Sequence, residues 1–283
     1  MTKYRYVAPA TVDEGLEILR QGGGKVRIAA GCTNLLPDMR AKELADCVLM
    51  DISGLGELRG VDADGGSIRI GALTTIDEML HSPLLEQEAV ALWRACRQFA
   101  DPLVRNRATV GGNLANGSPA ADSAVPLLAL DASATVASRA AGKREVPLCE
   151  LWRGPYQTAI AADELITAIT FPRDAARRSW FIKNGLRRAM AISLITVATA
   201  VKQDGCVVTG ARVALGAVGP TPLRARRTEE YLQGRAIDAA TLAEAAEIVR
   251  GEISPISDLR ASKEYRTHLA GVLLRRALEA VRA

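Results

Sequence analysis

Two short segments of the chain are rich in small, hydroxyl-bearing and amide side chains. The first is Ala29–Leu36, which follows an apolar run, and the second is Ala108–Asn116, which contains Gly111 and Gly112. Segments of this kind let backbone N–H groups approach an anion closely, so that they can bind phosphate. Neither contains the lysine of a P-loop or the Gly-x-Gly-x-x-Gly pattern of a dinucleotide fold. The pair indicates an anion site of another type, with two ordinary tight turns as the alternative.

An acidic residue, Asp122, follows the second segment, and this arrangement favours the ligand-binding interpretation. Other catalytic residue types are scarce: the chain has two histidines, His81 and His268, and five cysteines without a Cys-x-x-Cys spacing. A Ser-His-Asp triad, a zinc site or an iron–sulfur site has few residues to draw on. We therefore expect no catalytic residue and no metal site in this chain, and chemistry that belongs to a cofactor or a partner chain.

The composition is that of a folded protein with room for two domains. The chain has 283 residues, of which 48% are hydrophobic and 24% charged, and a domain takes about 150 residues. A net charge of +4 without a basic tract makes nucleic acid an improbable partner. The longest mostly apolar stretch, Ala189–Val201, is shorter than the roughly 18 residues of a membrane span. Met1–Tyr6 has no apolar core of a secretory signal, so we expect a cytoplasmic protein without a membrane span.

A small βαβ-like unit surrounds the first segment. Thr11 and Glu14 form a capping box that predicts a helix start. The expected elements are a helix ending at Gly22–Gly24, a strand at Val26–Ala30, a helix from Leu36-Pro37 and a strand at Val48–Ile52.

Further elements surround the second segment. They are a strand at Ser67–Leu73, a short helix from Thr75–Glu78, a longer helix at Glu86–Phe99, a short buried helix at Asp122–Leu130, and strands at Ala134–Val136 and Leu165–Phe171. The longer helix places Ala89, Leu92, Trp93 and Cys96 on one face.

A polar stretch, Pro172–Arg178, marks the most plausible domain boundary. Strands expected beyond it are Ile192–Val201 and Val207–Val218, and the helices are 228–233, 239–249 and 262–281. Strands followed by helices indicate an α+β second domain.

The last helix is expected to bury one apolar stripe. Its members are Tyr265, Leu269, Val272, Leu273 and Ala280. Leu274 and Leu278 lie off that stripe, and they either contact a partner subunit or pack on their own domain.

Both segments resemble motifs of the FAD-binding subunit of the molybdenum hydroxylases, the family of xanthine dehydrogenase and carbon monoxide dehydrogenase. Ala30–Asn34 occupies the place of the family motif A-G-G-T-D, and Thr109–Asp122 matches the motif T-[IVY]-G-G-N-[IL]-x-N-[AG]-x-P-x-[AS]-D throughout. Gly185–Ser193 and Arg260–Arg266 resemble segments of the xanthine dehydrogenase branch. The resemblance covers almost the whole chain.

The first motif departs from the family at two positions. Cys32 replaces the second glycine, and Asn34 replaces the acid. Cys32 is expected to be a small buried filler, because cysteine is often buried and inert; a thiol beside the flavin is the alternative.

The resemblance implies an α+β fold with two domains. A two-part FAD-binding domain of the vanillyl-alcohol-oxidase (PCMH) type would span residues 1–175, with subdomains at about 1–55 and 56–175. A smaller α+β domain of the CO dehydrogenase flavoprotein C-terminal type would span 176–283.

The same resemblance implies the residues that bind FAD. Backbone amides of the first segment and the hydroxyl of Thr33 would hold the pyrophosphate, and Asp122 would accept hydrogen bonds from ribityl hydroxyls. Leu165 and Lys183 would touch the flavin, with a core leucine and a solvated lysine as alternatives. The complete set is Arg27, Ile28, Ala29, Ala30, Gly31, Cys32, Thr33, Asn34, Leu35, Ala108, Thr109, Gly111, Gly112, Asn113, Asn116, Asp122, Leu165 and Lys183.

The function implied is electron transfer within a larger enzyme. A large subunit would carry molybdopterin and a small subunit two [2Fe–2S] clusters, in a dimer of heterotrimers. This chain would pass electrons through FAD to NAD, a quinone or oxygen, in a complex that oxidises a purine or another N-heterocycle. A carbon monoxide or aldehyde dehydrogenase complex is the alternative. A self-contained flavin oxidase and a scaffold that has lost FAD are further hypotheses.

Overall fold

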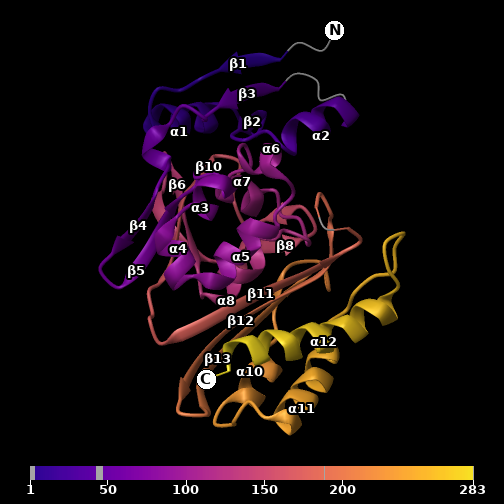
Figure 1. Ribbon diagram of the computed structural model, residues 1–283. Coiled ribbons are helices and arrows are strands. Elements are labelled where there is room, and N and C mark those ends of the chain that lie inside the picture. Colours follow the sequence, from indigo (N-terminus) through magenta and orange to yellow (C-terminus); the bar gives the residue numbers. More distant parts are fainter. Residues whose placement is uncertain (1–3, 43–46, 188, 283) are drawn as a thin grey trace.

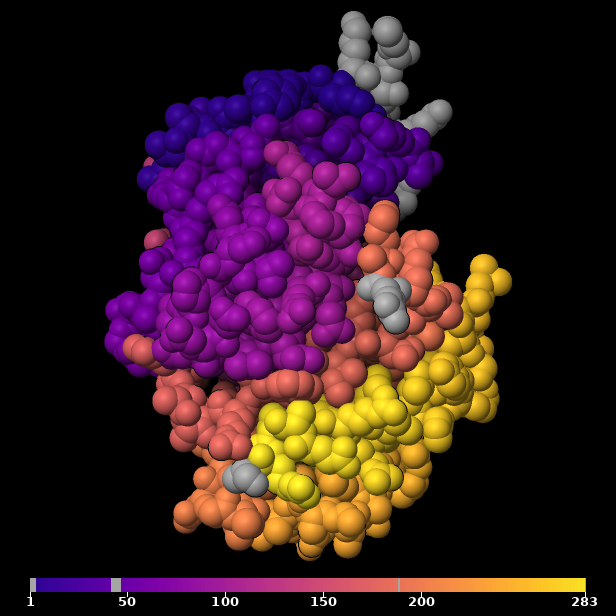
Figure 2. All heavy atoms as spheres, viewed as in Figure 1, coloured from indigo at the N-terminus to yellow at the C-terminus, as the bar shows by residue number. Residues whose placement is uncertain are grey.

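Three sheets are stacked along the molecule, with a pair of short strands beside them (Figure 1). The computed structural model describes residues 4–42, 47–187 and 189–282, so Arg188 of the segment Gly185–Ser193 lies outside it. The amino-terminal part, in indigo, caps one end, and the carboxy-terminal part, in orange and yellow, forms the other (Figure 2). No helix in the described ranges has the length and apolar character needed to cross a membrane.

The amino-terminal sheet is parallel, with strand order β1-β3-β2. Its elements are β1 (Arg5–Val7), α1 (Val12–Gln21), β2 (Val26–Ala29), α2 (Leu35–Lys42) and β3 (Val48–Asp51). The hydroxyl of Thr11 caps α1 by accepting from the N–H of Glu14 at 3.2 Å. The βαβ-like unit expected here is confirmed, and β1 adds a strand too short to predict from its three residues.

The middle sheet is antiparallel, with strand order β4-β5-β10-β6-β7. The strands are β4 (Val61–Asp64), β5 (Ser67–Gly71), β6 (Ser133–Ser138), β7 (Gly142–Pro147) and β10 (Glu164–Pro172), and β8 (Trp152–Gly154) pairs with β9 (Gln157–Thr158). The helical elements are η1 (Gly56–Leu58), α3 (Ile76–Leu80), α4 (Pro83–Glu88), α5 (Val90–Gln98), α6 (Pro102–Arg105), α7 (Val110–Ala115), α8 (Ala124–Ala129) and α9 (Leu148–Leu151).

The single helix predicted over Glu86–Phe99 is wrong. The chain forms two helices, α4 and α5, with a break at Ala89, where φ is −133° and ψ is 52°. Helix α4 begins early because Ser82 caps it and Pro83 fits its first turn. The hydroxyl of Ser179 accepts from the N–H of Ala91 at 3.1 Å, so a tertiary contact satisfies a donor at the new helix start.

The second segment is only partly the loop expected from its composition. Helix α7 begins within it, because Thr109 is an N-cap whose hydroxyl accepts from the N–H of Gly112 at 3.2 Å. The sequence did not predict this short helix, because two of its residues are glycines, which have a low helix propensity.

The carboxy-terminal sheet is an antiparallel meander, β11-β12-β13-β14. Its strands are β11 (Arg177–Gly185), β12 (Ser193–Asp204), β13 (Val207–Gly216) and β14 (Leu223–Arg224), followed by α10 (Arg226–Leu232), α11 (Ala239–Arg250) and α12 (Lys263–Val281). Helices α10 and α12 cover one face, and α5 and α8 contact the same sheet from the middle part of the chain (Figure 1). Strand β12 is therefore buried along most of its length.

The apolar stripe predicted for the last helix is partly wrong. Leu269 and Leu273 are buried, whereas Tyr265 and Ala280 are exposed. Leu274 and Leu278 are fully buried in the core of the carboxy-terminal part, so they are not subunit contacts. The buried face is rotated around the helix axis relative to the predicted stripe, because the helix packs against both the sheet and α11.

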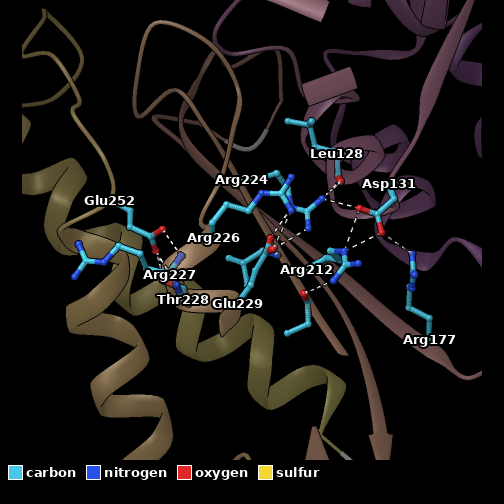
Figure 3. Close-up of polar contacts among 12 residues, drawn as sticks. Leu128, Asp131, Arg177, Arg212, Arg224, Arg226, Arg227, Thr228, Glu229 and Glu252 are labelled. Carbon is cyan, nitrogen blue, oxygen red and sulfur yellow. Dashed lines mark hydrogen bonds and ion pairs between the residues drawn. The ribbon is translucent and has the colours of Figure 1, made fainter. Parts of the chain in front are cut away.

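A partly buried ion network joins the middle and carboxy-terminal parts (Figure 3). The Arg224 guanidinium bonds to Glu229 at 2.5 and 2.8 Å, to Asp131 at 2.7 Å and to the carbonyl of Leu128 at 3.1 Å. Arg212 also donates to Asp131 at 2.8 Å. Burial opposes ionisation of Asp131, but the two arginines outweigh it and lower the pKa of that carboxyl. The network therefore fixes residues that precede the 173–176 connection against residues that follow it. The expected division into two domains at this connection stays a prediction.

Candidate cofactor site

The two small-residue segments meet at Gly31. A Cβ at this position would lie 1.8 Å from the carbonyl oxygen of Arg107, so only glycine permits the approach. Gly111 is similarly confined, since its Cβ would lie 2.7 Å from the Cβ of Ala72. The main chains of the segments thus form one continuous wall.

The first segment presents a run of free donors. The backbone N–H groups of Gly31, Cys32, Thr33 and Asn34 have no hydrogen-bond acceptor within the described residues. Helix α2 begins directly after them, at Leu35. Successive unpaired N–H groups at a helix start form a cradle for an anion such as a phosphate.

A cavity of about 290 Å³ opens between the segments. Fourteen of the eighteen residues expected to bind FAD line it. They are Ile28, Ala30, Gly31, Cys32, Thr33, Asn34, Leu35, Ala108, Thr109, Gly111, Gly112, Asn113, Asn116 and Leu165.

A second cavity of about 720 Å³ continues from the first. The two share five lining residues: Thr33, Asn34, Phe99, Asn113 and Asn116. The second cavity lies where the middle and carboxy-terminal parts meet, since residues of both parts line it, among them Asp122 of the former and Ser193 of the latter. Together the cavities form one continuous site, and Thr33 and Asn34 of the anion cradle border both of them.

The remaining four expected residues do not line the first cavity. Ala29 is buried in β2, and Arg27 donates to the carbonyl of Gly24 at 3.0 Å. Asp122 lines the second cavity, and the Nζ of Lys183 donates to the Asp122 carboxylate at 2.5 Å. The expected roles of Asp122 and Lys183 beside the flavin stay predictions, because each group is already engaged by the other.

Several lining residues were missed by sequence reasoning. Phe99, at the end of α5, lines both cavities, and Ile160 and Glu164 line the first. Ala72 and Leu73 reach it from the turn after β5. The sequence places Phe99 at the end of a helix, and no local pattern distinguishes it from a core residue.

Left-handed backbone is concentrated at the site. In the described residues, six non-glycine positions have positive φ, and five of them line one of the cavities: Cys32, Ala100, Tyr156, Met190 and Ala217. Such conformations cost energy and persist where the surroundings impose them, often at binding sites.

Cys32 has a φ of 61°, which explains why glycine occupies this place in the family motif. Burial raises the pKa of its thiol, so the group stays protonated. We expect Cys32→Gly to keep or slightly raise the free energy of unfolding, since the relief of strain offsets the greater freedom of glycine in the unfolded chain. Cys32→Val should lower it by about 1–2 kcal/mol. Urea unfolding of the two variants measures the difference, and equal stabilities would contradict the strain argument.

The second cavity has exposed apolar side chains among its lining residues. Four exposed side chains, Tyr156, Met190, Ile192 and Ile256, line it and form what we call the apolar rim. Ile256 is 70% exposed and Tyr156 68%. Exposed clusters of this kind mark interaction surfaces.

In the part of the chain described, no three His, Cys, Asp or Glu side chains are grouped so that they could hold a metal ion. The arrangement of the two cavities suits an elongated ligand with an anionic centre, one end in each cavity.

Comparison with known proteins agrees with this geometry. The family model for the FAD binding domain in molybdopterin dehydrogenase matches residues 2–174, and that for the CO dehydrogenase flavoprotein C-terminal domain matches residues 180–281. The putative xanthine dehydrogenase FAD-binding subunit of Escherichia coli (strain K12) is 34% identical, covering 98% of this chain and 96% of its own. The carbon monoxide dehydrogenase medium chain of Hydrogenophaga pseudoflava is 32% identical with the same coverage. A structure of reconstituted CO dehydrogenase from Oligotropha carboxidovorans matches with a TM-score of 0.95 and 30% identity, covering 99% of each chain.

Proposed function

Because the chain belongs to the family of FAD-binding subunits of the molybdopterin dehydrogenases, we propose that it holds one FAD across the two cavities and transfers electrons between partner subunits and an external acceptor. The family makes the chain an oxidoreductase flavoprotein of the molybdenum hydroxylase type. The observation that carries the proposed binding site is the run of N–H groups from Gly31 to Asn34, which have no acceptor among the described residues and lie next to the junction of the two cavities.

The FAD pyrophosphate is the anion that fits this junction between the cavities. Thr33, Asn34, Asn113 and Asn116 border both cavities, so a pyrophosphate there leaves one end of the cofactor in each. The adenosine end suits the smaller cavity, which Leu165 and Ile166 line. The flavin suits the larger cavity, which the apolar rim lines, because the ring must be reached by electron donors and acceptors.

The residues of this chain bind and orient the cofactor, while FAD supplies the redox chemistry by accepting electrons one at a time. The glycines let the backbone approach the pyrophosphate. Asp122 and Ser193 form part of the polar wall of the flavin cavity. No step requires an acid or base from this chain, in agreement with its scarcity of histidine.

The proposed complex contains a molybdopterin subunit and a [2Fe–2S] subunit, assembled as a dimer of heterotrimers in the cytoplasm. The apolar rim supports a protein partner at the flavin cavity, since four exposed apolar side chains are costly to leave in water. A purine or another N-heterocycle is the proposed substrate, supported by the xanthine dehydrogenase relative. Carbon monoxide or an aldehyde is the alternative, supported by the carbon monoxide dehydrogenase relative. NAD, a quinone and oxygen are the acceptors to be tested.

The absorbance spectrum of the purified chain tests cofactor binding. We expect flavin bands that survive desalting after incubation with FAD, either for the chain alone or for the complex co-expressed with its partners. Absence of flavin in both preparations would overturn the proposal. Turnover of a small alcohol or amine by the chain alone would instead favour a self-contained oxidase.

A further inference from the structure

Asp122 lies at the centre of a buried polar cluster that the binding of FAD does not by itself explain. Its Oδ2 accepts from the Nζ of Lys183 at 2.5 Å, and its Oδ1 accepts from the hydroxyl of Ser193 at 2.6 Å. Lys183 also donates to the carbonyl of Gln98 at 3.3 Å. The side chains of Asp122 and Lys183 are 9% and 8% exposed.

The cluster is assembled from distant segments. Asp122 precedes α8 in the middle part of the chain, whereas Lys183 is in β11 and Ser193 begins β12. The pairing of β11 with β12 shifts register between Asn184 and Gly185, so that Gly185 is opposite Ser193 and one extra residue of β12 bulges. A bulge re-aims the side chains beside it, and here Ser193 reaches the Asp122 carboxylate rather than a strand neighbour.

The charge state of Asp122 depends on these contacts. Burial raises the pKa of Asp122, and the Lys183 ammonium and the Ser193 hydroxyl oppose that rise. A hydrogen bond donated to a carboxylate stabilises its charged form. Loss of the Ser193 bond would therefore let the carboxyl take up a proton at a higher pH.

We propose that Ser193 is a positioning residue that keeps Asp122 ionised beside Lys183 and so keeps the wall of the flavin cavity electrically neutral. The inference rests on the proposed function, since Asp122 and Ser193 line the cavity assigned to the flavin ring. If Asp122 became protonated, the ammonium of Lys183 would stand uncompensated there. A positive charge stabilises an anionic reduced flavin and raises its reduction potential.

Other charged groups near the cluster do not reproduce this effect. Burial raises the pKa of Cys96, on α5, to about 12, so its thiol stays neutral. Arg105, on α6, donates to the carbonyl of Phe99 at 3.0 Å. Asp258 also lines the second cavity, and its carboxylate accepts from the backbone N–H groups of Arg260 and Ala261 and from the Arg266 guanidinium. These bonds outweigh burial and lower the pKa of Asp258 to about 2. Asp101 also borders the cavity, where it accepts from the N–H of Val104.

The test compares the flavin midpoint potential of the co-expressed complex between pH 6 and pH 9, with and without Ser193→Ala. At pH 9 we expect the same midpoint potential for the variant and the unaltered complex. At pH 6 we expect a higher midpoint potential for the variant, because its Asp122 takes up a proton at a higher pH. Ser193→Thr, which keeps the hydroxyl, should restore the original profile.

Thr199→Val is the matched control, because Thr199 is a buried hydroxyl on the same strand that donates to Ala277 instead of Asp122. Its profile should coincide with that of the unaltered complex. If the pH profile of the flavin potential is the same for Ser193→Ala as for this control, the inference is overturned. Should Ser193→Ala lose its flavin, Ser193→Cys supplies the same comparison: a partial shift supports the inference, and no shift overturns it. An unaltered complex without flavin contradicts the proposed function itself.

Discussion

A Gly31→Ala chain is expected to retain no flavin and to be less stable by about 3 kcal/mol or more. The added methyl would lie 1.8 Å from the carbonyl oxygen of Arg107, which is main chain and cannot rotate away. The two segments would have to separate, and the N–H groups that follow Gly31 would move away from the junction of the two cavities. Urea unfolding gives the loss of stability, and absorbance after desalting gives the loss of flavin.

Gly54→Ala is the control for that substitution. A methyl group added at Gly54 would meet no described atom within 4 Å, and the residue has no left-handed φ, so the change tests the loss of a glycine alone. We expect it to keep its flavin and its stability. A Gly31→Ala chain with a normal flavin content would show that the contact with Arg107 relaxes without disturbing the cofactor site.

Asp122→Ala is expected to lower the free energy of unfolding by about 3–5 kcal/mol, because it leaves a buried ammonium without a partner. Among the residues that the structure describes, Lys183 would keep only the carbonyl of Gln98 at 3.3 Å. The measurement is urea unfolding of the co-expressed complex and of the chain alone. A loss below about 1 kcal/mol would mean that water reaches Lys183 despite its burial.

The double variant Asp122→Ala, Lys183→Met separates the loss of the pair from the isolation of one charge. Replacing a buried ion pair by apolar side chains is often nearly neutral. We therefore expect the double variant to recover most of the stability lost by Asp122→Ala. A double variant as unstable as the single one would show that the carboxylate itself, through Ser193, holds the parts together.

Local signals in the sequence predicted much of the fold around the site. The capping hydroxyl of Thr11 and the alternation in β5 and β13 act over a few residues, so they can be recognised without tertiary information. The break at Ala89 could not be predicted, because it depends on a hydroxyl from Ser179 about ninety residues away. The rotation of α12 has the same origin: the helix is covered on two sides, which its own periodicity does not reveal.

The candidate site was predicted mainly through its motifs, since the two segments carry their chemistry in consecutive residues. Asp122 belongs to such a motif, but its bonds to Lys183 and Ser193 arise from strand pairing and a bulge. Phe99 lines both cavities without any motif. Residues that reach a site from a distant element leave no local pattern, and only the folded chain brings them together.

The apolar rim has a consequence for the colloidal behaviour of the subunit. The rim is an exposed apolar surface beside the larger cavity, formed by Tyr156, Met190, Ile192 and Ile256. A chain synthesised in excess of its partners would offer this surface to other copies of itself, and association would increase with concentration. Balanced synthesis of the subunits would then serve solubility as well as stoichiometry, since each partner would shield the surface as soon as it forms.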